Sequence, residues 1–514
     1  MSNKNKNTNE VGGFLKRVEK IGNSLPHPAM IFVILSVVLI IAADIIARTG
    51  YTISYYDAKA KELVEIGAVS LLNADGLRYI FNEATNNFTG FAPMGTVLVA
   101  MLGVGVSEHS GLFNATLKKM LSGVNPRILT ISVILAGVLS NIASDAGYLV
   151  VVPLGAMMFA SAGRHPIAGL VAAFAGVSGG FSANLLIGTT DPLLTGITNE
   201  ALLATGFDNL ELAATCNWYF LFASTFIVTI IGTFVTEKIV EKNLGTYTGS
   251  YVHENTPLTQ PELKGLTRAG IAVLIYVVIM SLLMFPQNAV FKEEGKVGIE
   301  SLKLFLNNGL MLGILLLFLI PGLVYGKTVG TIKDSNDLVK TMSKSMSGMG
   351  GYLVLAFFAS QFVNYFGHTN LGKIISYEGA EFLKSAGITG IPLMVIFVFL
   401  SAFLNLFMGS ASAKWAIMAP IFVPMMAKAG VHPALTQVAY RIGDSSTNII
   451  TPLMSYFAVI VAFMQKYDEK KGLGTLISTM LPYSIAFLIF WTLFLVIWML
   501  LGIPVGPGAP LYIM

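Results

Sequence analysis

The chain has 514 residues, of which 54% are hydrophobic and 12% are charged, and its mean hydropathy is +0.71. These values are typical of a polytopic membrane protein and exclude the roughly two to four soluble domains that the length alone would allow. The small net charge of +4 gives no reason to expect a nucleic-acid partner, and the single cysteine, Cys216, excludes an internal disulfide or a multi-cysteine metal site.

The N-terminal part predicts a basic tail, a first span, an outer loop and a returning span. Several lysines and an arginine precede the first long apolar run, so the positive-inside rule places residues 1–26 in the cytoplasm. No small-residue cleavage site follows that run, which we therefore interpret as a retained helix and not as a signal peptide. The first span is expected at 27–48, a polar outer loop at 49–89 and a second span at 91–108.

Residues 127–162 form an apolar run with a polar sequence, Ser140 to Gly147, at its middle. Each apolar half has about 15 residues, fewer than the roughly 20 that a helix needs to cross a bilayer. Basic residues at both ends, Arg127 and Arg164, place both ends on the cytoplasmic side. The pattern predicts a re-entrant helical hairpin, and the next span, 166–190, is interrupted by glycine and serine.

A second hairpin is predicted at 391–429, with a polar tip from Asn405 to Trp415, and a second broken span follows at 432–463. Charged residues at membrane depth are costly and usually functional, and irregular backbone is tolerated there only where it lines a cavity. Uninterrupted spans are expected at 218–236, 269–285, 304–325, 348–366 and 481–501. We therefore predict an all-α membrane protein with nine transmembrane helices and two re-entrant hairpins.

The two hairpin regions are related by an internal repeat. Ala162 to Pro166 recurs as Ala429 to Pro433, about 267 residues further on, and Gly176 recurs as Gly443. An odd number of predicted spans separates the copies, which predicts an inverted repeat with a transport site at the bilayer midplane. The expected division is a tail (1–26), scaffold parts at 27–90, 216–346 and 464–514, and repeat cores at 91–215 and 347–463.

Oxygen-bearing side chains gather at the tips and breaks of both copies. Half-helix N-termini favour anions, whereas unwound carbonyls and C-terminal ends favour cations, so these oxygens predict a site for Na⁺. The candidate ligands are Ser140, Asn141, Ser144, Asp145, Ser182 and Asn184 in the first copy, and Ser445, Thr447 and Asn448 in the second. The alternative interpretation is that small polar residues only allow the helices to pack closely.

Charged and aromatic residues suggest how a substrate is held. Asp444 and Arg441 lie three positions apart on one predicted helix and are expected to pair, or Arg441 to bind a substrate carboxylate. Trp415 at the second tip is expected to stack on an aromatic ring. Whether Asp191 or Asp145 is the functional carboxylate of the first copy stays open, since Asp191 also fits a solvated loop residue.

The remaining motifs argue against a histidine ligand site, a phosphate-binding loop and a protease site. His165 and His432 each precede a proline and are expected to cap helix starts and not to bind a ligand. Gly326-Lys-Thr lacks the upstream glycine of a phosphate-binding loop. Arg441-Ile-Gly-Asp falls short of the Gly-x-Gly-Asp pattern of intramembrane aspartyl proteases, the main rival class.

The motifs Ser140 to Gly147, Gly409 to Trp415 and Tyr440 to Pro452 resemble those of the p-aminobenzoyl-glutamate transporter (AbgT) family, within the ion-transporter superfamily, and the resemblance covers nearly the whole chain. It implies a homodimer with nine spans and two hairpins per protomer and an elevator-like mechanism in the bacterial inner membrane. The functional residues that it implies are Asp191, Asn405, Ser412, Trp415, Pro433, Arg441, Asp444 and Pro452.

The resemblance also implies substrates: p-aminobenzoyl-glutamate for uptake and sulfonamide antimetabolites for export. Both contain an aniline ring with a polar or anionic head, which stacking on Trp415 and pairing with Arg441 would suit. The direction of transport and the coupling ion stay open, because the carboxylates fit proton coupling and the Ser and Asn clusters fit Na⁺. The alternatives are a dicarboxylate carrier of the same superfamily and an intramembrane hydrolase.

Overall fold

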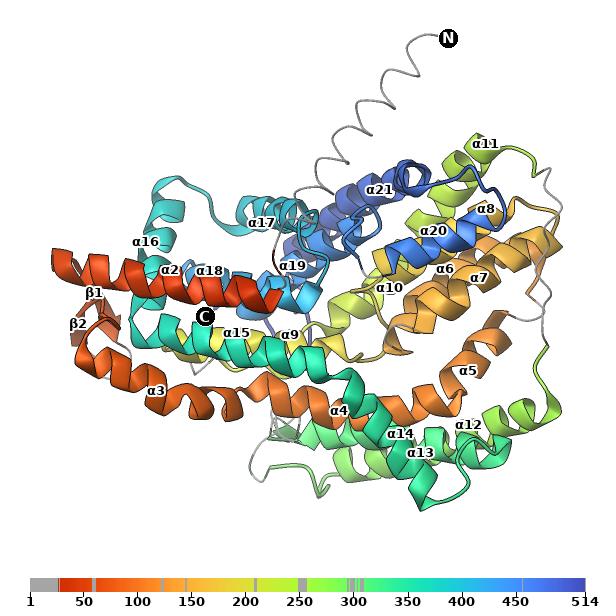
Figure 1. Cartoon of the computed structure of the whole chain (residues 1–514), viewed down its shortest axis with the longest axis horizontal. Helices are drawn as coiled ribbons and strands as arrows, with labels where there is room; N and C mark the ends of the chain where they lie inside the picture. Colours follow the sequence, from red (N-terminus) through yellow and green to blue (C-terminus); the bar gives the residue numbers. More distant parts are fainter. Residues whose placement is uncertain are drawn as a thin grey trace, which may run out of the picture.

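Long apolar runs dominate this chain, and such runs satisfy their backbone hydrogen bonds in a membrane only by forming helices or closed barrels. The computed structural model is accordingly almost wholly helical (Figure 1). It describes residues 26, 28–57, 62–121, 124–143, 146–207, 210–247, 257–293, 295, 301–302, 304–305, 309–454 and 456–513. The predicted tail before Pro26 and the candidate ligands Ser144 and Asp145 lie outside these residues.

The elements of the first half are α2 (Pro28–Thr49), β1 (Thr52–Asp57), β2 (Glu62–Gly67), α3 (Ala74–Thr89), α4 (Ala92–Ser110), α5 (Leu112–Leu121), α6 (Leu129–Ser140), α7 (Ala146–Ser161), α8 (Pro166–Phe174), α9 (Thr190–Thr205), α10 (Trp218–Val235) and α11 (Glu241–Leu244). Those of the second half are α12 (Gln260–Met284), α13 (Leu310–Val329), α14 (Ser335–Gly348), α15 (Gly350–His368), α16 (Leu371–Ser385), α17 (Gly390–Asn405), α18 (Ala411–Lys428), α19 (Pro433–Asn448), α20 (Phe457–Gln465) and α21 (Leu473–Leu500). Short 3-10 segments lie at Pro126–Ile128 and Asn141–Ala143, and π-helical turns at Ala175–Gly179 and Thr236–Val240.

Length and hydropathy identify the membrane-crossing candidates. Among the described residues, five helices are long and apolar enough to cross a bilayer: α2, α10 with its extension to Leu244, α12, α13 and α21. Three bent helix pairs, α4 with α5, α14 with α15 and α16 with α17, raise the number to eight if each is one span. A largely helical multi-span protein is therefore confirmed, and the count of nine spans stays a prediction.

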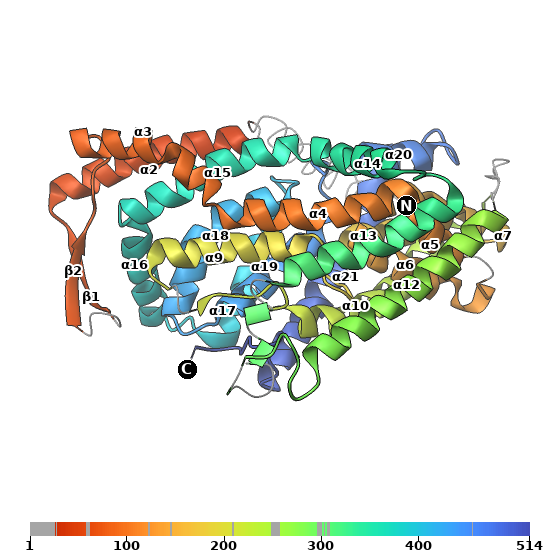
Figure 2. The ribbon, with the colours of Figure 1, turned by 90° about the horizontal axis from the view of Figure 1, so that it is seen from below.

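The all-α prediction was wrong for the outer loop. Residues 52–57 and 62–67 form a two-stranded antiparallel sheet in which Thr52 lies opposite Gly67, and α3 follows it. Both strands are rich in Ile, Val and Tyr, the residue types that favour a pleated conformation. The sheet lies at one end of the molecule (Figure 2). There, Tyr51 Oη donates a hydrogen bond to Glu378 of α16 at 2.6 Å, and α16 is a helix that the sequence interpretation did not include.

Both predicted hairpins are pairs of helices joined by short polar tips: α6 with α7, and α17 with α18. Each hairpin leads to a helix that begins at a proline behind a histidine cap. His165 Nδ1 accepts a hydrogen bond from Ile167 N at 3.2 Å, and His432 Nδ1 accepts one from Ala434 N at 3.3 Å. The prediction that these two histidines cap helix starts is confirmed.

Backbone geometry agrees with the repeat at equivalent positions, which include the match of His109-Ser-Gly-Leu112 with His368-Thr-Asn-Leu371. The break between α4 and α5 is made by Gly111 at φ +91°, and the break between α15 and α16 by Asn370 at φ +59°. Glycine and asparagine are the residues that most readily adopt this left-handed conformation. A Cβ on Gly176 would lie 2.4 Å from Ile134 O of α6, and one on Gly443 would lie 2.4 Å from Val398 O of α17. In each copy the broken helix therefore touches the backbone of the hairpin's first helix.

Helices from both halves pack together around the breaks. The first-half helix α9 lies along the second-half helix α18 (Figure 2). Helix α21 packs against α19, and both α10 and α21 pack against the π-helical turn that follows α8. On the other side, α4 packs along α13 so closely that a Cβ on Gly103 would lie 2.2 Å from Leu315 O. The two broken helices, α8 and α19, thus lie inside the bundle, which places their polar residues away from lipid.

Candidate substrate and ion site

The second hairpin tip carries a buried ion pair. Lys414, in the first turn of α18, places its Nζ 2.5 Å from Asp444 Oδ1 of α19, and each side chain is 1% exposed. The same ammonium donates a hydrogen bond to Asn405 Oδ1 at the end of α17. It also lies 5.6 Å from the centre of the Tyr440 ring. A charge so deeply buried requires a partner of opposite sign, and here the tip of the hairpin supplies the cation.

Asn405 joins the hairpin tip to the end of α19. Its single amide nitrogen faces three oxygens: Asp444 O at 2.7 Å, Thr447 Oγ1 at 2.9 Å and Asn448 Oδ1 at 2.9 Å. The amide nitrogen has only two protons to donate, so oxygens outnumber donors here. Asn448 Nδ2 donates in turn to Asp444 Oδ2 at 3.3 Å. Of the second-copy cation ligands that the sequence suggested, Thr447 and Asn448 therefore lie together beside Asn405, whereas Ser445 does not.

The expected pairing of Arg441 with Asp444 was wrong. Arg441 Nη1 lies 2.8 Å from Asp191 Oδ1 at the start of α9, and the two side chains are 3% and 5% exposed. Asp191 Oδ2 also accepts a hydrogen bond from Gly188 N at 2.6 Å. Although Arg441 and Asp444 are three apart on α19, the first faces α9 and the second faces the hairpin tip, and each finds its partner there. Asp191 is thus a buried, paired carboxylate and not a solvated loop residue.

Trp415 is fully buried and already packs against another aromatic ring at a tilt of 32°. Its ring centre lies 4.4 Å from that of Tyr440, and its Nε1 donates to Thr198 Oγ1 at 3.0 Å and to Leu194 O at 3.2 Å, both on α9. Thr198 Oγ1 also accepts a hydrogen bond from Gln437 Nε2 at 2.9 Å. The tryptophan therefore fastens α18 to α9, and it does not line the cavity described next.

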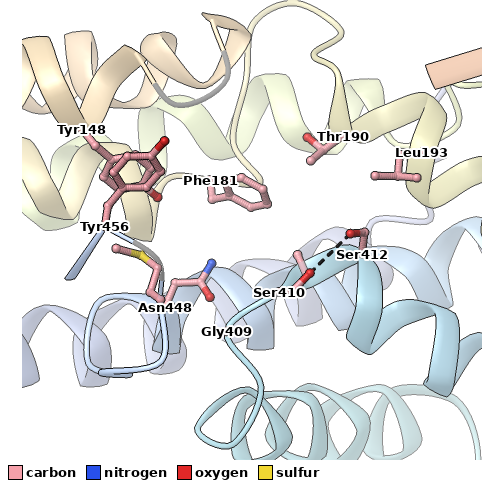
Figure 3. Close-up of a pocket in the computed structure, with 11 residues that line it drawn as sticks. Tyr148, Phe181, Thr190, Leu193, Gly409, Ser410, Ser412, Asn448 and Tyr456 are labelled. Carbon is pink, nitrogen blue, oxygen red and sulfur yellow. Dashed lines mark hydrogen bonds between the residues drawn. The ribbon is translucent and has the colours of Figure 1, made fainter. Parts of the chain in front are cut away.

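A cavity of about 460 Å³ lies where both hairpins and both helix breaks meet (Figure 3). One side is aromatic: Tyr148 of α7 and Tyr456 before α20 stack with ring centres 4.7 Å apart and planes 4° apart, with Phe181 beside them. The other side is polar, with Ser410 and Ser412 of the hairpin tip; their hydroxyls lie 3.5 Å apart. The remaining lining residues are Thr190, Leu193, Gly409, Ala411, Asn448 and Met454.

The cavity and the ion pairs are adjacent and distinct. Of the eight residues that the family resemblance implied, Ser412 lines the cavity, whereas Asn405, Trp415, Arg441 and Asp444 are each 2% exposed or less. Asn448 connects the two parts, because it lines the cavity and contacts Asp444. Pro433 is the first residue of α19, and Pro452 lies in the break between α19 and α20.

The described first-copy candidates are mostly engaged with backbone. Ser140 Oγ donates to Gly137 O at 2.6 Å, and Asn141 Nδ2 donates to Gly180 O at 3.2 Å across to the break after α8. Ser182 N donates to Ser445 Oγ at 3.1 Å, so the break after α8 touches α19 of the second copy. Asn184 is buried beside them. The first copy thus repeats the asparagine link, since Asn141 donates to Gly180 O as Asn405 donates to Asp444 O.

Sequence reasoning missed Lys414 and the aromatic side of the cavity. Lys414 stands in the quoted tip motif, and a lysine inside an apolar hairpin signals a buried charge that needs a partner. Among the described residues no group of three His, Cys, Asp or Glu side chains could hold a metal.

The sequence matches a transporter family, and the fold is similar to two solved transporter structures. Residues 13–513 match the AbgT putative transporter family. The chain is 38% identical over 491 residues to the p-aminobenzoyl-glutamate transport protein of Escherichia coli K12, covering 96% of this chain and 95% of that one. It resembles the structure of the Alcanivorax borkumensis YdaH transporter with a TM-score of 0.87 and 41% identity, covering 94% of this chain and all of the other. It resembles Neisseria gonorrhoeae MtrF, described within a class of antimetabolite efflux pumps, with a TM-score of 0.89 and 47% identity, covering 97% and 100% of the two chains.

Proposed function

Because the chain belongs to the AbgT transporter family, we propose that it carries p-aminobenzoyl-glutamate or a related aminobenzoyl or sulfonamide compound across the membrane, driven by a proton or Na⁺ gradient. The chain is a membrane transporter and not an enzyme, so the intramembrane hydrolase alternative falls away. Its relatives are named for p-aminobenzoyl-glutamate transport and for antimetabolite efflux. p-Aminobenzoyl-glutamate and the sulfonamides that the family resemblance implies share an aromatic amine with a polar head.

The observation that carries the substrate proposal is the two-sided cavity between the hairpins. Its volume of about 460 Å³ falls in the range of small-molecule sites, which is roughly 300–1,000 Å³. We assign the aminobenzoyl ring to the aromatic side formed by Tyr148, Phe181 and Tyr456, in place of the expected stacking on Trp415. The carboxylate or sulfonyl head is assigned to the hydroxyls of Ser410 and Ser412, at the N-terminus of α18, where backbone N–H groups favour an anion.

We propose that the coupling ion binds behind the cavity, around Asn405, Asp444, Thr447 and Asn448. Oxygens of Asp444, Thr447 and Asn448 gather around the Asn405 amide nitrogen at the end of α19, where a helix C-terminus also favours a cation. The buried Arg441–Asp191 ion pair then holds the start of α9 against α19 and does not bind substrate. Asn141, Ser182 and Asn184 are kept as candidates for a second cation at the first copy.

The finer architecture is likewise a proposal. Equivalent caps, breaks and close contacts in the two copies favour an inverted repeat with nine spans and two re-entrant hairpins. In an elevator-like movement, the hairpins and broken helices would move against a scaffold of a homodimer in the bacterial inner membrane, with a cytoplasmic N-terminus. The packing of the helices favours assigning α10 and α21 to the moving part, and α4 together with α13 to the scaffold. The sequence-based division had instead placed α10 and α21 in the scaffold and α4 in a repeat core.

Uptake of labelled p-aminobenzoyl-glutamate into proteoliposomes tests the proposal, with Na⁺ and proton gradients imposed separately. We expect accumulation under one gradient and a loss of at least about tenfold in Ser410→Ala/Ser412→Ala, because two donors to the substrate head are removed, each worth roughly 1 kcal/mol or more. Ser478→Ala is the matched control, since that hydroxyl is exposed on α21 and donates only to Thr475 O. Equal transport of an aliphatic dicarboxylate such as succinate would favour the dicarboxylate carrier instead.

A further inference from the structure

Helix α12 presents an apolar face that the rest of the described chain leaves uncovered. In its most apolar stretch only 6% of the residues are buried, and the helix runs along the outside of the bundle (Figure 2). Ile271, Ile275, Val278 and Leu282 follow one another at intervals of three or four residues, so they lie on one face, and each is between 50% and 63% exposed. These four residues, the α12 stripe, require an apolar partner.

Two cations continue the α12 stripe toward the start of the helix. Arg268 precedes Ile271 by three residues, Lys264 precedes Arg268 by four, and both side chains are exposed. Arg268 Nη1 also donates a hydrogen bond to Thr328 Oγ1 of α13 at 3.4 Å. From Arg268 to Leu282 the helix rises about 21 Å, which is more than the roughly 15 Å of one hydrocarbon leaflet. This face therefore has the length and the polarity of a lipid molecule that lies along it.

Helices α5 and α13 bring further cations to the same end of α12. Ala115 of α5, Ala269 of α12 and Tyr325 of α13 belong to one buried cluster, so the three helices meet there. Lys118 follows Ala115 by one helical turn, and Lys327 follows Tyr325 by two residues and is exposed. Four cations from three helices therefore gather at the charged end of the α12 stripe.

These cations are not matched by acidic partners. Among the residues that the structure describes, no ion pair is formed by the four cations Lys118, Lys264, Arg268 and Lys327. One carboxylate, Glu262, lies near Lys118, but it is held in the capping box of α12, where its Oε2 accepts hydrogen bonds from Thr259 N and Oγ1, both at 2.7 Å. The cluster has a net positive charge and is complementary to a phosphate.

We propose that this cluster and the α12 stripe form a binding site for an anionic phospholipid. Its phosphate lies among Lys264 and Arg268 of α12, Lys118 of α5 and Lys327 of α13, and an acyl chain follows the stripe. Basic pockets between membrane-spanning helices bind anionic head groups in this way. The site is formed by α5, α12 and α13, apart from the cavity between the hairpins, so the inference goes beyond the proposed function and does not depend on its substrate.

A second copy of the chain fits this surface less well than a lipid does. Copies related by a twofold axis along the membrane normal place the same residue of each copy at the same depth. Packing of stripe on stripe would bring Lys264 and Arg268 of one copy against the same cations of the other, and like charges at close range repel. An anionic lipid instead supplies both the opposite charge and the apolar surface.

Quenching of tryptophan fluorescence by brominated lipids tests the proposal. The full chain with Ile275→Trp is reconstituted in phosphatidylcholine vesicles in which one tenth of the lipid is phosphatidylglycerol, and the acyl chains of one lipid or the other are brominated. The change in fluorescence relative to the unmodified chain reports which lipid contacts the stripe. We expect phosphatidylglycerol to be enriched at least about fivefold over its bulk fraction, the factor that one cation at a membrane surface contributes.

Adding Lys264→Gln and Arg268→Gln removes two of the four cations and should lower this enrichment at least about threefold. Quenching by brominated phosphatidylcholine should persist in this variant and so show that the stripe is still exposed to lipid. Ile230→Trp is the matched control, because Ile230 is 59% exposed on α10 and lies seven residues before Glu237, which accompanies Lys238. At that position we expect an enrichment of less than about twofold.

Three results would each overturn the proposal. The first is equal enrichment at the two tryptophan positions, which would show a general preference of the protein surface for anionic lipid. The second is unchanged enrichment in the variant without the two α12 cations. The third is a tryptophan at position 275 that neither lipid quenches, because a second copy of the chain then covers the stripe.

Discussion

The partner of Arg441 can be established by double-mutant cycles on the free energy of unfolding. The side chains of Arg441 and Asp191 are 3% and 5% exposed and 2.8 Å apart. Removing one member of a buried pair leaves the other charge without compensation and costs about 3–5 kcal/mol. We therefore expect Arg441→Gln and Asp191→Asn each to destabilise the protein by this amount.

The double variant should be far less damaging than the sum of the two single changes. Two neutral amides replace two charges there, so neither charge is left alone, and the coupling energy is expected to be about 2–3 kcal/mol. The same cycle on Arg441 and Asp444 should give about 1 kcal/mol or less, because these side chains point to different neighbours. Reversible denaturation in mixed micelles provides the measurement.

An exposed ion pair provides the reference value for these coupling energies. Arg78 lies 2.7 Å from Asp75, but the two side chains are 72% and 89% exposed, so their cycle should give no more than about 0.5 kcal/mol. A coupling energy for Arg441 with Asp444 that exceeds the one for Arg441 with Asp191 would refute the pairing described here. It would restore the arrangement that the sequence suggested.

Three further predictions concern the cavity and the repeat. Tyr456→Leu removes a stacked ring worth roughly 0.5–1.5 kcal/mol, so the Kd of p-aminobenzoyl-glutamate should rise about 2- to 10-fold in an equilibrium binding assay while that of succinate does not change. Gly443→Ala places a Cβ 2.4 Å from Val398 O and should lower the unfolding free energy by about 1–3 kcal/mol, whereas Gly474→Ala meets open space and should change it by no more than about 0.5 kcal/mol. Asn370→Ala should cost about 1–2 kcal/mol in the same measurement, because alanine at φ +59° is strained and the hydrogen bond to a backbone carbonyl is lost; no loss would show that the break tolerates any residue.

Local patterns in the sequence were sufficient for the elements of the repeat. Apolar runs with polar middles identified both hairpins, and a histidine before a proline identified the starts of α8 and α19. These features depend on neighbours along the chain: helix caps, helix breakers and runs too short to cross a bilayer. The duplicated motif also drew attention to Asn405, Asp444, Thr447 and Asn448, which lie together in the structure, but it did not single out Lys414 or the aromatic residues of the cavity.

Side-chain contacts between different helices could not be predicted from such local patterns. Arg441 and Asp444 are neighbours on α19, and sequence spacing alone made them a pair, but side chains on one helix can face different neighbours. The strand pair β1–β2 was missed because a polar loop with weak alternation gives little signal before its strands meet.

The sequence by itself determined the class of protein and the list of polar residues near the breaks, and it predicted the two hairpins and the repeat, because each of these follows from local composition and spacing. Only the tertiary structure decided which charges neutralise each other and which side chains line the cavity. The physical reason is that a buried charge is stabilised by whichever opposite charge lies within contact distance, and this depends on how α9, α18 and α19 pack. The sequence analysis assigned no role to Lys414; it lies at the centre of the site because this packing brings it into contact with Asp444.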